Sequence, residues 1–178
     1  ATKIFNTCEG GAVILKSKKD YIRAKQLINI GYDYSKPNTK PSVGINAKMS
    51  ELNAAWGLAL LKKYNQILRN KKNKYFYYMQ SLNNKNLIIN KKFPNNYNYL
   101  PILLKNKLIK NKIIKILNKS NIYPRKYFYP SLNLISHLKY KKMKIAENIS
   151  ERILCLPIYE DINNYIIKKI CNVINSYE

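Results

Sequence analysis

The sequence is poor in cysteine, histidine, glycine and proline. Its three cysteines, Cys8, Cys155 and Cys171, lie far apart without a CxxC pair, and it has a single histidine. This pattern indicates neither a zinc site nor a disulfide framework, so we expect no metal ligands. Five glycines and seven prolines in 178 residues are too few for a collagenous or low-complexity chain. With 46% hydrophobic residues, the chain can build a sizeable core.

Long apolar runs are also missing. No stretch approaches the roughly 18 consecutive apolar residues that a membrane helix needs. No basic-then-apolar leader with a small-residue cleavage site is recognisable either. We therefore expect a soluble protein of the cytoplasm, with reduced cysteines and no membrane partner.

Acidic residues are scarce. The chain has nine Asp and Glu residues and 33 Lys and Arg residues, which gives it a net charge of +24. Charge of this size is typical of proteins that bind nucleic acid. However, 29 of the basic residues are lysine and four are arginine, whereas base readout favours the planar fork of arginine. The lysines are spread through the predicted helices, and codons rich in A and T account for the composition. We expect no specific nucleic-acid partner, with a basic nucleic-acid-binding module as an alternative.

The first part of the chain predicts a strand, a helix and a loop. The apolar run 11–16 follows two glycines and is typical of a buried strand. Ser17 then precedes a segment with apolar residues near helical spacing, and Gly31 stands where a helix stop belongs. Residues 33–45 contain two prolines and a glycine and predict a loop.

A long helix is predicted from Ser50 to Leu82. Ser50 suits the N-cap, and Glu51 lies in the first turn, where the helix dipole favours negative charge. The apolar residues that follow keep the spacing of an amphipathic helix over about 30 residues. A helix of this length is typical of a link between two subdomains.

Residues 83–178 alternate between strand and helix patterns. The predicted elements are a strand at 97–105, which Pro101 marks as an edge or a bulge, a helix at 106–119, an extended aromatic segment at 122–130, a short apolar segment at 154–159 and a helix at 161–176. This order predicts a small α/β subdomain. The chain is thus expected to divide into 1–49, 50–82 and 83–178.

The chain begins Ala1-Thr2-Lys3 and at once enters a sequence typical of the middle of a protein. We therefore expect the C-terminal part of something longer. Lys3 lies in a short polar turn ahead of Glu9-Gly10-Gly11 and the predicted strand. Active sites of α/β proteins lie at such element ends, and glycines there let the backbone approach a ligand. From the residues alone, a surface lysine beside a tight turn is the more ordinary interpretation.

Four segments stand out in order along the chain and reach from Lys3 to Tyr159: ATKIFNTCEGGAVI, GINAKMSELNAAWGLALL, PRKYFYPSLN and SERILCLPIY. Together they resemble the C-terminal half of the pyridoxal-phosphate-dependent nucleotide-sugar aminotransferases of the DegT/StrS group. The resemblance implies an α/β, aspartate aminotransferase-like fold of type I. Residues 1–49 would then be a remnant of the large cofactor-binding domain, 50–82 the long linking helix, and 83–178 the small C-terminal subdomain.

The resemblance also implies roles for particular residues. Lys3 matches the Schiff-base lysine of pyridoxal 5'-phosphate, which serves as base and acid in turn. Asn46 matches an asparagine that reaches the cofactor phosphate of the neighbouring subunit, which implies a homodimer with shared active sites. Arg125, Tyr127 and Tyr129 fall in the sugar-facing loop and are the predicted substrate-binding residues. From the residues alone, Asn46 also fits a plain turn and the tyrosines fit core aromatics.

The reaction implied is transfer of an amino group from glutamate to a nucleotide-linked keto-deoxysugar, in surface polysaccharide or glycan synthesis. Many members have a histidine where Leu132-Asn133 stands, and PSLN is similar to the subgroup that aminates C4 of a dTDP-4-keto-6-deoxyhexose. In the family, the segment before the lysine supplies most of the cofactor site, and the sequence here has only Ala1 and Thr2 before Lys3. A catalytically inactive, truncated remnant is therefore the second interpretation.

Overall fold

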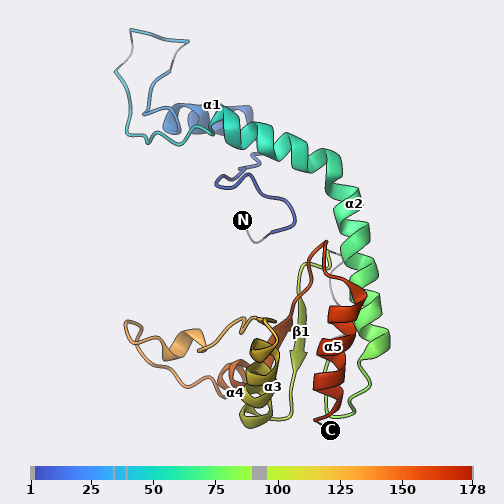
Figure 1. Cartoon of the computed structure of the whole chain (residues 1–178). Coiled ribbons are helices and arrows are strands. Elements are labelled where there is room, and N and C mark those ends of the chain that lie inside the picture. The colour runs from blue at the N-terminus through green and yellow to red at the C-terminus, as the bar shows by residue number, and fades with distance from the viewer. Residues whose placement is uncertain (1–2, 34, 39, 90–95, 178) are drawn as a thin grey trace. The chain divides into compact units, whose positions relative to one another are not determined.

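The computed structural model describes residues 3–33, 35–38, 40–89 and 96–177. The chain forms two compact units, Ala1–Tyr64 and Asn65–Glu178, and the boundary falls within the long helix α2 (Glu51–Ser81) (Figure 1). None of the described helices combines the length and the apolar character needed to cross a membrane.

The first unit carries the helix predicted after Ser17. Helix α1 spans Lys18–Leu27, and the Ser17 hydroxyl accepts a hydrogen bond of 3.0 Å from the Asp20 amide, as an N-cap does. The chain turns at Gly31, whose φ of +79° suits glycine. Helix α2 begins as predicted, with the Ser50 hydroxyl accepting from the Asn53 amide at 3.2 Å, and its 31 residues confirm the predicted length.

The prediction of a buried strand at 11–16 is wrong. These residues are extended but belong to no strand among the described residues, and they are exposed to solvent. Val13 is 79% exposed and Ile14 is 96% exposed. The physical reason is that a strand exists only through its neighbours, and the described residues place no strand beside this segment.

The second unit is built on a two-stranded sheet. Strands β1 (Leu100–Leu103) and β2 (Ile153–Leu156) pair antiparallel, with Leu100 opposite Leu156. The helices of this unit, besides the end of α2, are α3 (Lys107–Lys119), α4 (Lys144–Arg152) and α5 (Asn164–Asn175), and a 3-10 turn spans Leu132–Leu134. The strand predicted at 97–105 and the helices predicted at 106–119 and 161–176 are confirmed, whereas α4 was not predicted.

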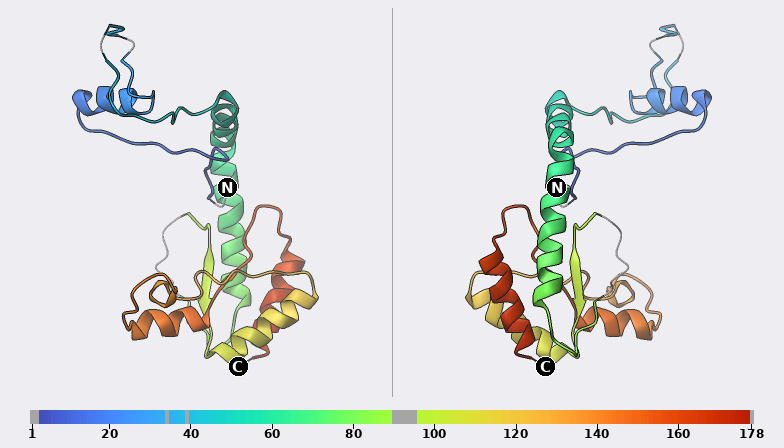
Figure 2. Two further views of the ribbon diagram at one scale, coloured as in Figure 1. Left: turned by 90° about the vertical axis from the view of Figure 1, so that its left-hand side faces the viewer. Right: turned by 90° about the vertical axis from the view of Figure 1, so that its right-hand side faces the viewer.

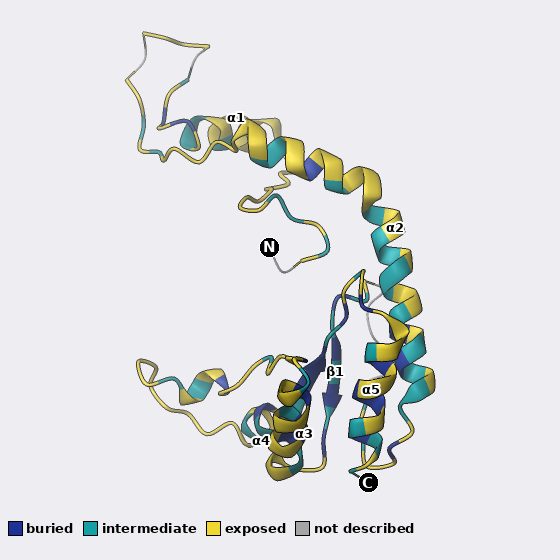
Figure 3. Cartoon of the chain, in the orientation of Figure 1, coloured by how far each residue is buried: buried dark blue, intermediate teal, exposed yellow. Residues whose placement is uncertain are grey.

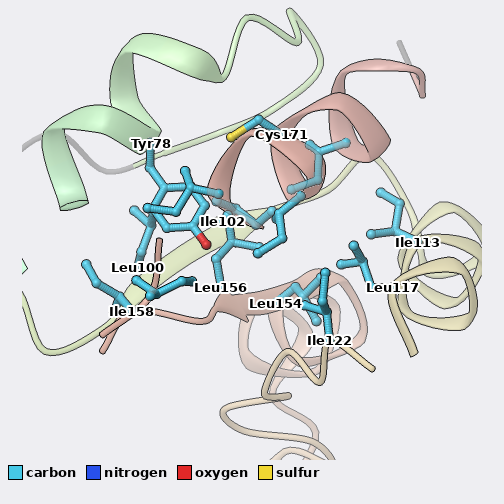
Figure 4. Packing of buried hydrophobic residues seen from close by; sticks show 14 of the residues in the cluster. Tyr78, Leu100, Ile102, Ile113, Leu117, Ile122, Leu154, Leu156, Ile158 and Cys171 are labelled. Carbon is cyan, nitrogen blue, oxygen red and sulfur yellow. The ribbon is translucent and has the colours of Figure 1, made fainter. Parts of the chain in front are cut away.

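Every buried hydrophobic side chain among the described residues lies in the second unit. Figure 3, which marks buried residues of any type in dark blue, shows this colour along β1 and on the inner sides of α3 and α5. The core joins the end of α2, both strands, α3 and α5 (Figure 4). Its fully covered members include Tyr78, Leu100, Ile113, Leu117, Leu154, Ile167, Ile170 and Ile174. The Tyr78 side chain is fully buried, and its hydroxyl donates to the Pro157 carbonyl at 2.8 Å. Burial of Tyr78 therefore leaves its hydroxyl paired.

Candidate active site

Lys3 lies at the start of a tight turn, and its side chain is exposed. The turn is pinned by Asn6, whose side-chain amide donates to the Lys3 carbonyl at 3.2 Å. The oxygen of the same side chain accepts from the Cys8 amide and from the indole N–H of Trp56, each at 3.2 Å. One asparagine therefore holds the lysine-bearing turn against the first turns of α2.

The segment after the turn is held by its backbone. The Glu9 carbonyl accepts from the Asn53 side chain at 2.6 Å and from the Thr7 hydroxyl at 3.1 Å. At Gly10, φ is +155° and a Cβ would lie 2.3 Å from the Thr7 hydroxyl oxygen, so only glycine fits there. Glu9 thus holds the turn with its main chain.

Gly57 is a site residue that sequence reasoning missed. A Cβ at this position of α2 would lie 2.8 Å from the Thr7 methyl carbon, so the glycine lets the turn approach the helix closely. The signal was present in the sequence as a lone glycine inside a strong helical pattern, which usually has a packing reason.

Asn46 is exposed and lies beside the end of α1. It forms an isolated antiparallel bridge with Asn29, flanked by hydrogen bonds of 3.1 Å from the Ile30 amide to the Ile45 carbonyl and 3.0 Å from the Ala47 amide to the Ile28 carbonyl. Asn46 is therefore positioned by its main chain, and its side chain is exposed to solvent.

Two glycines make this bridge possible. A Cβ at Gly44 would lie 2.3 Å from the Gly31 nitrogen, and one at Gly31 would lie 1.6 Å from the Ser42 carbonyl oxygen. The buried Asn29 side chain accepts from the Lys48 ammonium at 2.8 Å. This hydrogen bond ties the Lys48 side chain to Asn29, the residue that pairs with Asn46.

The first unit also contains a cavity of about 470 Å³ between α1 and the following loop, lined in part by Tyr21, Asn29 and Lys48. At its rim the Ser35 hydroxyl and the Gln26 side chain donate to the Asp33 carboxylate, and the hydrogen bond from Ser35 is the main reason that the Asp33 pKa lies below its ordinary value. Neither Lys3 nor Asn46 lines this cavity.

In the second unit, Arg125 pairs with β2. Its amide donates to the Cys155 carbonyl at 3.0 Å, and the Cys155 amide donates back at 2.8 Å. The Arg125 side chain is left exposed. The residues that follow, which carry the two predicted substrate-binding tyrosines, therefore start from a fixed point on the sheet.

Tyr127 and Tyr129 differ in their surroundings. The Tyr127 ring packs edge-on against Tyr99, with centroids 5.5 Å apart, and stacks on Phe128 at 4.8 Å. Tyr129 is 43% exposed. The ammonium groups of Lys107 and Lys110 lie 5.7 and 4.8 Å from its ring centroid, within the range of a cation–π contact.

Lys110 is a second residue that sequence reasoning missed. It is 2% exposed, and its ammonium group donates to the Ser150 carbonyl at 3.3 Å. Burial lowers its pKa from the ordinary value. The sequence signal was its spacing, since Lys110 falls on the same helical stripe as Ile113 and Leu117.

The segment after Tyr129 is tied to α4. The Glu147 carboxylate accepts from the Asn133 side chain at 2.7 Å and from the Met143 amide at 2.8 Å. The hydrogen bond from the Met143 amide is the main reason that the pKa of Glu147 lies below its ordinary value. Asn133 in turn accepts from the Ser131 hydroxyl at 2.6 Å and donates to the Lys141 carbonyl at 2.8 Å. The PSLN stretch is thus ordered by its own polar side chains.

The predicted site residues fall into two groups. Lys3 and Asn46 belong to the first unit, and Arg125, Tyr127 and Tyr129 belong to the second. Among the described residues, no three His, Cys, Asp or Glu side chains gather where they could hold a metal ion. Lys3 offers an exposed primary amine, the chemical group that can form an imine with an aldehyde cofactor.

Residues 1–175 match the DegT/DnrJ/EryC1/StrS aminotransferase family, and the chain belongs to this family of pyridoxal-phosphate-dependent sugar aminotransferases. The chain is similar to a dTDP-4-amino-4,6-dideoxy-D-glucose transaminase of Shigella dysenteriae, with 33% identity over 98% of this chain and 50% of the relative. It is also similar to one of Escherichia coli, with 35% identity over 93% of this chain and 47% of the relative.

The fold comparison agrees. The structure of DesI in the presence of its TDP-sugar product aligns with a TM-score of 0.81 and 24% identity, covering 98% of this chain and 46% of that one. The predicted α/β aminotransferase fold is thereby confirmed. The chain spans about half the length of the relatives it matches.

Proposed function

We propose that this chain contributes the catalytic lysine, Lys3, to a pyridoxal-phosphate-dependent transfer of an amino group from glutamate to a nucleotide-linked keto-deoxysugar. The observation that carries the proposal is the match of residues 1–175 to the aminotransferase family. The dTDP-4-keto-6-deoxyhexose is the proposed acceptor, because the relatives with 33% and 35% identity are dTDP-4-amino-4,6-dideoxy-D-glucose transaminases.

Each residue group has a part in this proposal. The Lys3 amine would hold the cofactor covalently and then carry a proton between the substrate carbon and the cofactor carbon. The bound cofactor supplies an electron sink for the deprotonated carbon. The turn built on Asn6, Gly10 and Gly57 would fix where the amine can reach.

The remaining predicted residues would act on the substrate and on the neighbouring subunit. The exposed side chain of Asn46, on its fixed bridge, would reach the cofactor phosphate of a second subunit in a homodimer. Arg125 would bind the anionic nucleotide, and Tyr127 and Tyr129 would face the sugar. We place the protein in the cytoplasm, a proposal that its three free cysteines support.

The test is made on this chain joined, as a single polypeptide, to the half of the Shigella relative that it does not match. With pyridoxal phosphate, we expect a visible absorption band and transfer of nitrogen from glutamate to the keto sugar. Lys3→Ala should abolish both. The matched control is Lys16→Ala, which removes another lysine of the first unit.

A Lys3→Ala protein that still transaminates at the full rate would remove Lys3 from the mechanism. A folded fusion that neither takes up the cofactor nor transaminates would favour the inactive remnant.

A further inference from the structure

Among the described residues, Lys110 is the only charged side chain that is buried. It shares the covered side of α3 with Ile113 and Leu117, in the core of the second unit. Taking an ammonium group out of water is costly unless nearby groups compensate its charge. The groups that face this ammonium therefore determine whether it can stay protonated.

The ammonium group of Lys110 faces the Ser150 carbonyl and the Tyr129 ring. It donates to the carbonyl at 3.3 Å and lies over the ring, 4.8 Å from the centroid. The face of an aromatic ring attracts a cation, and the attraction is stronger where water is excluded. The Tyr129 ring thus supplies part of the compensation that the buried charge needs.

Lys107, one turn earlier on α3, shows the contrast. Its ammonium group also lies near the Tyr129 ring, at 5.7 Å, but its side chain is exposed and forms an ion pair of 2.7 Å with Glu151. The hydrogen bond with Glu151 is the main reason that the pKa of Lys107 lies above its ordinary value, whereas burial lowers the pKa of Lys110. Lys107 therefore has a carboxylate partner, and Lys110 depends on the ring.

Tyr129 ends a segment that is fixed at other points as well. From the end of α3 the chain crosses the second unit toward the orange segment before α4, as both views of Figure 2 show. On this path Arg125 pairs with β2 through its main chain, and the Tyr127 ring packs on Tyr99. Tyr129 is 43% exposed, so its contact with α3 holds the ring and leaves part of it accessible.

We infer that Lys110 is a positioning residue for the sugar-facing segment: its ammonium group, held on the Ser150 carbonyl, fixes the Tyr129 ring against α3. The inference rests on the proposed function, in which Tyr129 faces the sugar. Lys110 is itself covered and acts through the ring. The alternative is a purely structural lysine that only joins α3 to α4 through Ser150.

The first measurement uses this chain alone and does not depend on catalysis. A ring that lies over the ammonium group shifts the NMR signals of the Lys110 ε-methylene protons upfield. We expect Tyr129→Leu to remove this shift, whereas Tyr165→Leu, at a 73% exposed ring of α5, should leave it in place. A shift that Tyr129→Leu leaves unchanged would overturn the inference.

The second measurement uses the fusion with the unmatched half of the Shigella relative. Lys110→Met removes the charge and should raise KM for the keto sugar on the order of tenfold, with kcat and KM for glutamate within about twofold. Lys110→Arg keeps a cation over the ring and should hold KM for the sugar within about threefold. Lys112→Met, at an exposed lysine of the same helix, is the matched control.

Stability separates positioning from a purely structural role. Replacing a buried charge by an apolar side chain of similar volume is often neutral or stabilising, so the urea midpoint of Lys110→Met should stay or rise while KM for the sugar rises. In the Tyr129→Leu background, Lys110→Met should add no further increase in KM, because the ring through which it acts is gone.

An active fusion in which Lys110→Met leaves KM for the sugar unchanged would overturn the inference. Equal increases in KM with and without the Tyr129 ring would also overturn it, in favour of the structural lysine. A fusion that does not transaminate, with the Lys110 shift still lost in Tyr129→Leu, would remove the proposed reaction and support the hold of Lys110 on Tyr129.

Discussion

The two units of this chain differ in how much apolar surface they bury. The second unit encloses a hydrophobic core between α2, the sheet, α3 and α5. The first unit, over its described residues, buries only Asn29, Gly31 and Gly57 and holds itself together with polar contacts. Those contacts include the Asn6 bonds of the lysine turn and the bridge at Asn46.

The proposed catalytic lysine, Lys3, therefore belongs to the unit with the lower stability of its own. Hydrogen bonds between exposed groups contribute little net free energy, whereas buried apolar area drives folding. A working enzyme built on Lys3 therefore depends on surface that another part of the fold must cover.

Truncating a core side chain of the second unit should lower the free energy of unfolding more than any of the other substitutions. Ile113→Ala, at a fully buried side chain, should lower the free energy of unfolding by about 2–5 kcal/mol. Ile14→Ala, at an exposed side chain of the first unit, should change it by less than about 0.5 kcal/mol. Urea unfolding measures the free energy of unfolding of both variants. Equal decreases in the two would show that the units do not differ in how they are stabilised.

The pH dependence gives the next effect. Burial raises the pKa of the Cys171 thiol from 9.0 to about 12. Above pH 9 the unfolded chain releases this proton while the folded chain keeps it, so stability falls as pH rises toward 12, by at most about 1.4 kcal/mol per pH unit.

Cys171→Ala should make the decline between pH 9 and 12 shallower, as measured by urea midpoints across that range. Cys8→Ala removes the exposed thiol of the first unit and serves as the control. A slope that Cys171→Ala leaves untouched would show that this thiol is not buried in the folded chain.

Removing a helix cap should have a different effect in each unit. The Asn163 side chain accepts from the Ile166 amide at 2.8 Å at the start of α5, and Asn163→Ala should cost about 1 kcal/mol of global stability. Ser17→Ala removes the cap of α1, which packs into no core, so it should speed amide exchange at Asp20 and leave the global midpoint in place. A shifted global midpoint in Ser17→Ala would mean that α1 unfolds together with the second unit.

The elements with strong local signals could be predicted from the sequence. The Ser50 cap and long apolar periodicity define α2, and a similar pattern defines α3 and α5. Helix α4 was not predicted because it is only nine residues long and its start has no Ser, Thr, Asp or Asn cap; the Glu147 carboxylate accepts from the Met143 amide instead. The prediction of a strand at 11–16 failed because a strand is defined by the strands that pair with it, and the described residues place none beside this segment.

The candidate site divides in the same way. Lys3, Asn46 and the 125–129 segment could be proposed from short motifs. For Gly57 and Lys110 the sequence gives only a weak signal, a lone glycine in a helix and a lysine on an apolar stripe. Their roles depend on residues that the fold brings close, Thr7 for the glycine and Tyr129 for the lysine.

The second unit is stabilised by its own core, whereas the described residues of the first unit form none. Residue-resolved amide exchange of this chain alone compares the stability of the two units. We expect amides of β1, β2, α3 and α5 to exchange only through global unfolding, and those of 12–16 and α1 to exchange orders of magnitude faster. Equal protection of both units would show that the first unit is as stable as the second.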